Sequence, residues 1–162
     1  MPEAKTKKAA ARDKRQGKSA STQAGEYVHE EIEHVRKGKH GARSAKQAIA
    51  IGLSKARRAG VKVPVSKTAK KSTRQKAAQD EQASGHRKKA ASKRSHATKR
   101  ALKKEGHTAA SHSSLSRQAT RSAQKRSAAS RSAAAKQAFR TKGAAGRSAA
   151  AKKAANTRKR QA

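Results

Sequence analysis

Residues 21–60 read STQAGEYVHEEIEHVRKGKHGARSAKQAIAIGLSKARRAG, and this stretch carries most of the pattern that specifies a fold. Its first part places apolar side chains on one line of a 3.6-residue helix and glutamates on the other side. The apolar line consists of Ala24, Tyr27, Val28, Ile32 and Val35. This periodicity predicts a helix over about residues 22–37, with Ser21 or Thr22 as its N-cap and Gly38 as its stop.

A second helix is predicted over about residues 44–59, with Ser44 as N-cap and Gly60 just after its end. Its apolar line consists of Ala45, Ala48, Ile49, Gly52, Leu53 and Ala56. Gly52 lies within this line, where a missing side chain allows the partner helix to approach closely. The two segments therefore predict a helical hairpin of about 40 residues, a marginal size for independent folding. A homodimer through the same apolar stripes would relieve that shortage of core.

The composition argues against a large enzyme. The chain has 162 residues, with 44 Lys and Arg against 9 Asp and Glu, a formal net charge of +35 and a pI of about 11.8. Ala accounts for 38 of the hydrophobic residues, which leaves only 14 larger ones, and ten of these lie between Tyr27 and Val65. Most of the chain thus cannot offset its ordering entropy by apolar burial. We therefore expect no large globular enzyme. No run is long and apolar enough to span a membrane, so we expect no membrane protein either.

Charge and apolar content divide the chain into three parts. Residues 1–20 form a basic arm and residues 21–65 the hairpin module, and each has a net charge of +5. Residues 66–162 form a tail with a net charge of +25 and only three bulky apolar residues. We therefore predict a mainly α protein whose arm and long tail are largely disordered, with short helices in the tail. No secretory signal is evident, so a cytoplasmic location is expected. The absence of Cys excludes disulfide bonds and thiolate metal sites.

The tail contains an internal repeat. The sequence RSAAAK occurs at residues 131–136 and again at 147–152, and the similarity extends over residues 131–142 and 147–158. Each copy combines a Ser cap, helix-favouring Ala and C-terminal cations, and a third such segment covers residues 96–104. Without an apolar face these helices should be marginal in isolation. The cations of the two repeats are the expected phosphate contacts: Arg131, Lys136, Arg147, Lys152, Lys153, Arg158, Lys159 and Arg160.

The connector at residues 37–44 is a candidate anion site, because it combines two glycines, three Lys or Arg residues and a helix start. Backbone amides near Ser44 would hold a phosphate, with Lys39 and Arg43 as side-chain partners. An exposed interhelical loop explains the same residues equally well.

The outward side of the second predicted helix carries further cations. Lys46, Arg57 and Arg58 would face a nucleic-acid groove or, as on most helices, only solvent. His29, His34 and His40 are separated by five and six positions, which does not stack them as metal ligands on one helix. Three nearby glutamates leave a weak metal site as an alternative, but exposed polar side chains are the preferred interpretation, so we predict no metal. No supported Ser-His-Asp grouping and no pair of carboxylates in an apolar setting is present, so we predict no cofactor and no catalytic residue.

Four words occur in order within residues 21–60: STQAGE (21–26), EEIEH (30–34), GKHGARS (38–44) and KQAIAIGLSKARRAG (46–60). In these words the chain resembles a family of small, basic, uncharacterised bacterial proteins that are often labelled DNA-binding. The resemblance implies a bacterial origin and brings no catalytic residues or ligand. The tail is similar to bacterial histone-H1-like, Lys/Ala-rich proteins in composition only.

Together these features lead us to expect a nucleoid-associated protein that binds duplex DNA largely without sequence preference, by neutralising phosphates. An RNA- or ribosome-associated factor is the first alternative. A protein-interaction module is the second, in which Glu26, Glu30 and Glu33 dock a basic partner and the tail only localises it.

Overall fold

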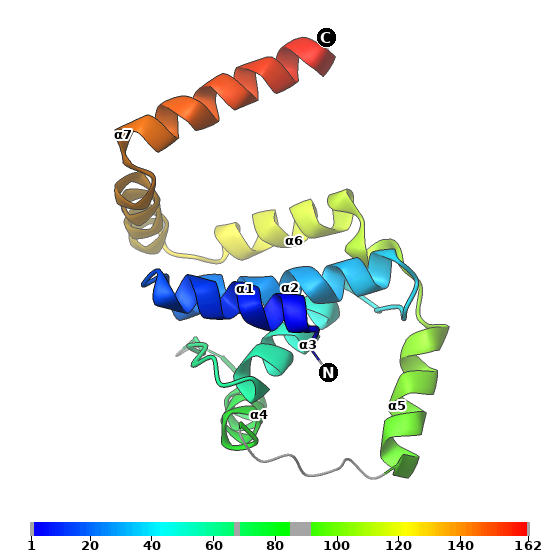
Figure 1. Cartoon of the computed structure of the whole chain (residues 1–162). Helices are drawn as coiled ribbons and strands as arrows, with labels where there is room; N and C mark the ends of the chain where they lie inside the picture. Colours follow the sequence, from blue (N-terminus) through cyan, green and yellow to red (C-terminus); the bar gives the residue numbers. More distant parts are fainter. Residues whose placement is uncertain (1, 67–68, 85–91, 162) are drawn as a thin grey trace. The chain divides into compact units, whose positions relative to one another are not determined.

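The structure is a computed structural model that describes residues 2–66, 69–84 and 92–161. These residues form helices and connecting loops, without a strand, so the expected mainly α class is confirmed. The helices are α1 (Ala4–Arg15), α2 (Ala20–Arg36), α3 (Ala45–Arg58), α4 (Lys71–Gln82), α5 (Ser92–Lys104), the 3₁₀ helix η1 (Thr108–Ala110), α6 (His112–Gln124) and α7 (Ala128–Gln161) (Figure 1). None of the described helices has the length and apolar character needed to cross a membrane.

The hairpin predicted at about residues 22–37 and 44–59 is present as α2 and α3. Ser44 is the N-cap of α3, as expected, and its Oγ accepts a hydrogen bond from the backbone N–H of Gln47 at 3.3 Å. The cap of α2 is Ser19, whose Oγ accepts from Thr22 N at 3.3 Å, and the helix begins two residues earlier than predicted. The left-handed φ of +69° at Gly38 ends α2, because glycine has no Cβ penalty there.

Gly52 brings α2 and α3 into close contact, as its place in the apolar line suggested. A Cβ on Gly52 would lie 2.6 Å from the Cα of Val28 and 3.0 Å from the carbonyl oxygen of Tyr27. At these distances a Cβ on residue 52 would overlap the backbone of α2, so any residue larger than glycine would force the two helices apart.

The described core consists of two small clusters on either side of this contact. The first joins the hairpin to α1 and to the segment after α3, and comprises Ala10, Ala24, Tyr27, Ala56, Val61 and Val63. The second joins it to η1, and comprises Val35, Ala42, Ala48, Ala109 and Ala110. Part of each apolar stripe of the hairpin is thus covered within one chain, while Val28, Ile32, Ile49 and Leu53 are only half-buried. A homodimer that used the covered part would have to displace these contacts.

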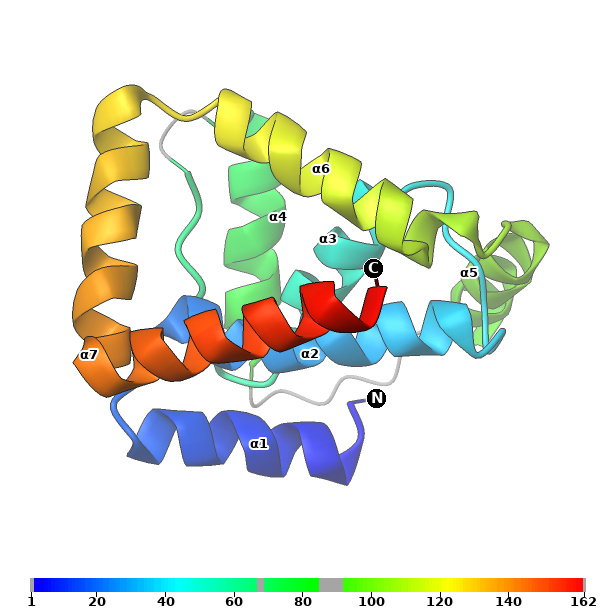
Figure 2. The ribbon, with the colours of Figure 1, turned by 90° about the horizontal axis from the view of Figure 1, so that it is seen from above.

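The expectation of a disordered arm at residues 1–20 is wrong for the residues described. α1 lies beside α2 and runs in the opposite direction (Figures 1 and 2), with Ala10 and Asp13 buried. Asp13 accepts a hydrogen bond from Lys18 at 2.6 Å, and the backbone N–H of Glu3 donates to Glu30 at 3.1 Å. The arm is held in place by small and charged side chains. A count of bulky apolar residues does not include their contribution to stability.

The expectation of a largely disordered tail is wrong as well. α4 packs against α3 (Figure 2) through Ala77, which is 4% exposed, and Asp80, which is 2% exposed. η1 then contributes Ala109 and Ala110 to the second core cluster. Buried alanines and one buried carboxylate therefore order these segments, in place of the bulky apolar side chains that the tail lacks. Residues 67, 68, 85–91 and 162 of the expected tail, and Met1 of the expected arm, lie outside the described residues.

By their contacts the residues fall into two compact units, Met1–Gln118 and Ala119–Ala162, so the boundary lies within α6. The second unit contains the end of α6 and all of α7. α7 begins after Ser127, whose Oγ accepts from Ser130 N at 3.2 Å, so Ser132 lies inside the helix and is not its cap. Gly143 interrupts α7 with φ 60° and ψ 178° and divides it into two helical segments. The two expected short helices are therefore present, separated at Gly143, while Gly146 is helical.

Candidate nucleic-acid interface

The two units differ sharply in charge. All nine acidic residues precede Gly106, so the unit Ala119–Ala162 carries 13 Lys and Arg and no Asp or Glu. Nearly all of its described side chains are exposed. Its cations therefore have no Asp or Glu partner within their own unit, and no acidic side chain of that unit offsets their mutual repulsion.

The predicted tail contacts lie on the two segments of α7. Arg131 and Lys136 are on the first segment, and the other six are on the second. At 100° per residue, the cations of the second segment point in three directions around the helix rather than along one stripe. The six are Arg147, Lys152, Lys153, Arg158, Lys159 and Arg160. Such an all-round distribution suits contact with phosphates on both sides of a groove and does not define a single base-reading face.

Arg147 differs from the other predicted contacts, because it is used inside the unit. Its guanidinium carbon lies 3.5 Å from the centroid of the Phe139 ring, and its Nη1 donates to the carbonyl oxygen of Phe139 at 2.9 Å. The residue therefore stacks on the side chain and caps the backbone of the first segment across the Gly143 break. Phe139 is 59% exposed even so, which leaves this corner open to solvent.

α5 is a cationic helix that the sequence reasoning did not include among the binding residues. Its 13 residues contain six Lys and Arg and no acidic side chain. Those whose side chains are described are all exposed: Lys93, Lys99, Arg100, Lys103 and Lys104. The sequence already contains these cations, but the predicted phosphate contacts of the tail lie in and just after the repeats at residues 131–142 and 147–158.

The predicted anion site in the connector is assembled differently from expectation. Lys39 Nζ lies 2.9 Å from Glu3 Oε1, and Arg43 Nη2 lies 3.5 Å from Glu105 Oε1. The backbone amide of Gly41 donates to Leu102 O at 2.9 Å, and the next amide donates to the carbonyl oxygen of Gly106. Both cations and both amides thus serve contacts with other parts of the first unit. A Cβ at Gly41 would overlap the carbonyl oxygen of Glu105, which explains the glycine there.

The predicted outward face of α3 is partly covered by α4. Arg58 Nε donates to Asp80 Oδ1 at 2.9 Å, and Ser54 Oγ donates to Asp80 Oδ2 at 2.7 Å. Arg57 is half-buried, and its Nε has no hydrogen-bond partner among the described residues. Lys46 is exposed near the start of the helix. The structure therefore does not bring Lys46, Arg57 and Arg58 together on one free surface.

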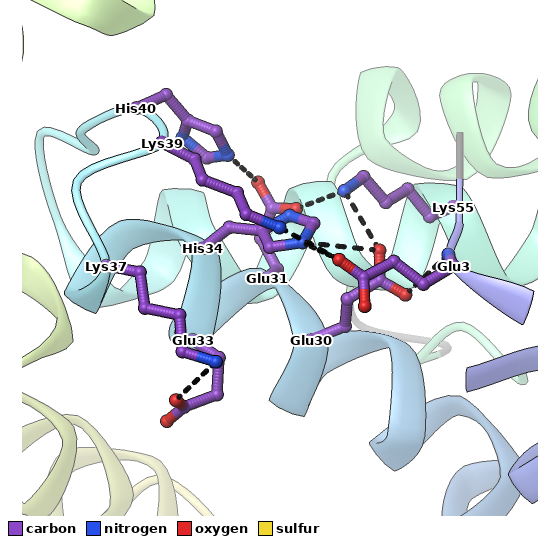
Figure 3. Close-up of polar contacts among 9 residues, drawn as sticks. All are labelled: Glu3, Glu30, Glu31, Glu33, His34, Lys37, Lys39, His40 and Lys55. Atoms are coloured by element: carbon purple, nitrogen blue, oxygen red, sulfur yellow. Dashed lines mark hydrogen bonds and ion pairs between the residues drawn. The ribbon is translucent and has the colours of Figure 1, made fainter. Parts of the chain in front are cut away.

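Three of the acidic residues of α2, Glu30, Glu31 and Glu33, lie in the half of the helix nearer the connector, where Figure 3 shows them with Glu3. Glu30 and Glu31 are 6% and 1% exposed, and Lys55 forms ion pairs with both. Hydrogen bonds from His34 and then Lys39 lower the pKa of Glu3 from its ordinary value of 4.5 to about 2. Because this carboxylate is ionised and can only accept, His34 Nε2 is the donor in their 2.9 Å hydrogen bond.

Glu31, His34 and His40 offer ligand atoms that all lie within 4.8 Å of one another (Figure 3). The sequence reasoning weighed a weak metal site of these histidines with the nearby glutamates and set it aside, because the histidines do not stack on a single helix. Glu31 and His34 are three residues apart on α2, and the connector folds back to bring His40 beside them. The remaining candidate, His29, is exposed on α2 and is not part of the group.

Residues 13–67 match the family model of a family of unknown function (DUF6496). The match covers roughly a third of the chain, from the end of α1 through α2 and α3, and so includes the stretch whose words suggested an uncharacterised family. No curated protein and no solved structure matches the chain.

Proposed function

We propose that this chain is a non-enzymatic protein that binds duplex DNA largely without sequence preference, with residues 119–162 and α5 supplying most of the phosphate contacts. The observation that carries the proposal is the segregation of charge: 13 cations and no Asp or Glu in the second unit, on helices with exposed side chains. Each phosphate that these cations neutralise releases condensed counterions, which drives binding without any reading of bases.

Two further features favour duplex over single-stranded nucleic acid. The chain has one Phe, one Tyr and no Trp, and Tyr27 is 3% exposed, so aromatic platforms for unstacked bases are scarce. The second segment of α7 also has cations on all sides, as a helix between two phosphate backbones requires. A cytoplasmic location at the nucleoid follows as part of the same proposal, together with the bacterial origin that the sequence resemblance implies.

The protein-interaction alternative loses support from the positions of its glutamates. Glu30 is 6% exposed, and Glu33 forms ion pairs with Arg36 and Lys37. Glu26, Glu30 and Glu33 therefore do not form one free acidic face that could dock a basic partner. RNA binding remains the competing outcome of the test below, because counterion release acts on both nucleic acids.

The test measures affinity against salt concentration for duplex DNA, single-stranded DNA and structured RNA in parallel, with the full chain and two charge-matched double variants. Lys152→Gln with Lys153→Gln removes two cations from α7, whereas Lys39→Gln with Arg43→Gln removes two that face Glu3 and Glu105. We expect the α7 variant to reduce the slope of log K against log salt on duplex DNA by up to about 1.8, at 0.9 per phosphate contact. The connector variant should change it much less.

An equal reduction of the salt slope in the two double variants would contradict the assignment of the phosphate contacts to α7. Tighter binding to structured RNA than to duplex DNA at matched salt would replace the DNA proposal with the RNA alternative.

A further inference from the structure

The group at Glu31, His34 and His40 raises a question separate from nucleic-acid binding, because it contains a buried charged oxygen without a hydrogen bond. Glu31 is 1% exposed, and its Oε2 accepts from Lys55. Its Oε1 has no hydrogen-bond partner among the described residues. Buried carboxylate oxygens are nearly always satisfied, so an unsatisfied one indicates a missing partner.

The ring of His40 lies beside this oxygen. His40 Nδ1 lies 3.1 Å from the carbonyl oxygen of Gly41, and since a carbonyl can only accept, Nδ1 carries a proton. His40 Nε2 lies 3.2 Å from Glu31 Oε1. In a neutral imidazole this Nε2 has a lone pair, so two acceptors face each other and repel unless a proton or a metal ion lies between them.

The same tautomer argument applies to His34. Its Nε2 donates to Glu3, which leaves Nδ1 with the lone pair in the neutral ring. Histidines that bind metals usually donate their other ring N–H to a carboxylate or a backbone carbonyl. His34 has a carboxylate partner in Glu3, and His40 has a carbonyl partner in Gly41. Lys39, which also contacts Glu3, holds that carboxylate in place.

The local charge is negative in a strongly basic protein. The carboxylates of Glu3, Glu30 and Glu31 face the ammonium groups of Lys39 and Lys55, which leaves an excess of one negative charge when both histidines are neutral. A dication compensates this excess. Two imidazoles with one carboxylate form a donor set that suits zinc and its neighbours and not the oxygen-seeking Mg²⁺ or Ca²⁺.

We propose that Glu31, His34 and His40 bind one divalent transition-metal ion of the zinc class, with a fourth position open to water. In tetrahedral zinc sites the ligand bonds are about 2.0–2.2 Å, which places ligand atoms roughly 3.4 Å apart. The ligand atoms of the three residues lie within 4.8 Å of one another. Side-chain rotation, chiefly of His40 in the connector, is therefore enough to bring them to the distances of a zinc site. The ion would tie the connector to α2, and the connector in turn holds the end of α5 through Gly41.

The test uses the full chain, treated with nuclease, stripped of metal and kept at high salt so that nucleic acid does not contribute. Zn²⁺ is titrated against a competing chromophoric chelator, and Co²⁺ is added separately to record its visible absorption. We expect one Zn²⁺ per chain and a Co²⁺ spectrum typical of four or five nitrogen and oxygen ligands. His40→Gln should weaken Zn²⁺ binding at least tenfold, since even loss of a group that orients a ligand costs about 10–100-fold.

His29→Gln is the matched control, because His29 is exposed on α2 outside the group, and it should bind Zn²⁺ like the unmodified chain. Glu31→Gln probes the buried ligand, and circular dichroism reports whether that variant still folds. His40→Gln keeps the test decisive in either case, since His40 lies in a connector rather than in the core. Absence of stoichiometric Zn²⁺ binding, or equal affinity in His40→Gln and His29→Gln, overturns the proposal.

Discussion

Among single residues, Gly52 has the most demanding environment in the hairpin, because Val28 Cα and Tyr27 O occupy the space where its side chain would be. We predict that Gly52→Ala destabilises the first unit by about 1 kcal/mol or more, since overpacking costs roughly 1–3 kcal/mol and alanine returns only about 1 kcal/mol of helix propensity. Gly25 is the matched control on α2, with nothing within 4 Å of its Cβ position. Gly25→Ala should stabilise by about 0.5–1 kcal/mol. Urea unfolding followed by circular dichroism measures both, and a stabilising Gly52→Ala would contradict the close packing.

Asp80 provides a pH-dependent contact at the same scale. Burial raises its pKa, but hydrogen bonds from Ser54, Arg58 and Lys76 outweigh burial and lower the pKa below its ordinary value of 3.8. A carboxyl whose pKa is lower in the folded state stabilises the fold above pH 3.8, and this contribution is lost as the pH falls through the folded-state pKa. Asp80→Asn should therefore cost about 1–3 kcal/mol near pH 7, where hydrogen bonds to a charge are lost.

The difference between Asp80→Asn and the unmodified chain should disappear at pH values below the folded-state pKa of Asp80, because both then lack the charge. Urea unfolding at a series of pH values measures this. Glu81→Gln, at an exposed neighbouring position, serves as the control and should stay within about 0.5 kcal/mol at every pH. A difference that persisted undiminished in acid would mean that Asp80 acts through shape and not through charge.

At the level of elements, periodicity located α2 and α3, and the reason is that both bury a stripe of apolar side chains at helical spacing. α1 and α4 left no such trace. Each buries one alanine, Ala10 or Ala77, and one aspartate, Asp13 or Asp80, that is satisfied by nearby cations. An aspartate reads as a solvent-exposed residue in a sequence, and its partners become visible only when the helices are in place. The metal-type group escaped prediction for the same reason, since it depends on the path of the connector.

The break in α7 depends on Gly143, whose φ of +60° other residues rarely adopt. We predict that Gly143→Ala joins the two segments into one straight helix. Spin labels at Ser132→Cys and Asn156→Cys, in a chain without native cysteine, report the change. A straight helix would place these positions about 36 Å apart at 1.5 Å per residue, and the broken one would place them closer. Gly146→Ala is the control, because Gly146 is already helical, and it should leave the distance unchanged. Equal distances in all three chains would contradict the break.

For the whole molecule, the distribution of carboxylates matters more than the net charge. Among the described residues, eight Lys and Arg side chains of the first unit form ion pairs with its acidic residues. Four of them join distant segments and help to hold the fold together: Lys39, Arg43, Lys55 and Arg58. The other four pair with a residue three to five positions away: Lys18, Arg36, Lys37 and Lys76. The second unit has no acidic residue for such pairs. The same residue types therefore stabilise the fold in one unit and remain available to a polyanion in the other. The sequence showed the charge difference, but which cations of the first unit are paired required the structure.

This division predicts how strongly salt weakens binding to duplex DNA. If about half of the 13 cations in Ala119–Ala162 reach phosphates, six or seven contacts form, and affinity should fall by roughly 10³–10⁴-fold between 50 and 200 mM salt. A chain ending at Gln118, which retains both core clusters, should keep its helical circular dichroism and lose most of this slope. Duplexes of scrambled sequence should bind the full chain with similar affinity, because phosphates carry no sequence information. A shortened chain with an undiminished slope would place the contacts in the first unit, where α1 and α5 each carry six Lys and Arg residues.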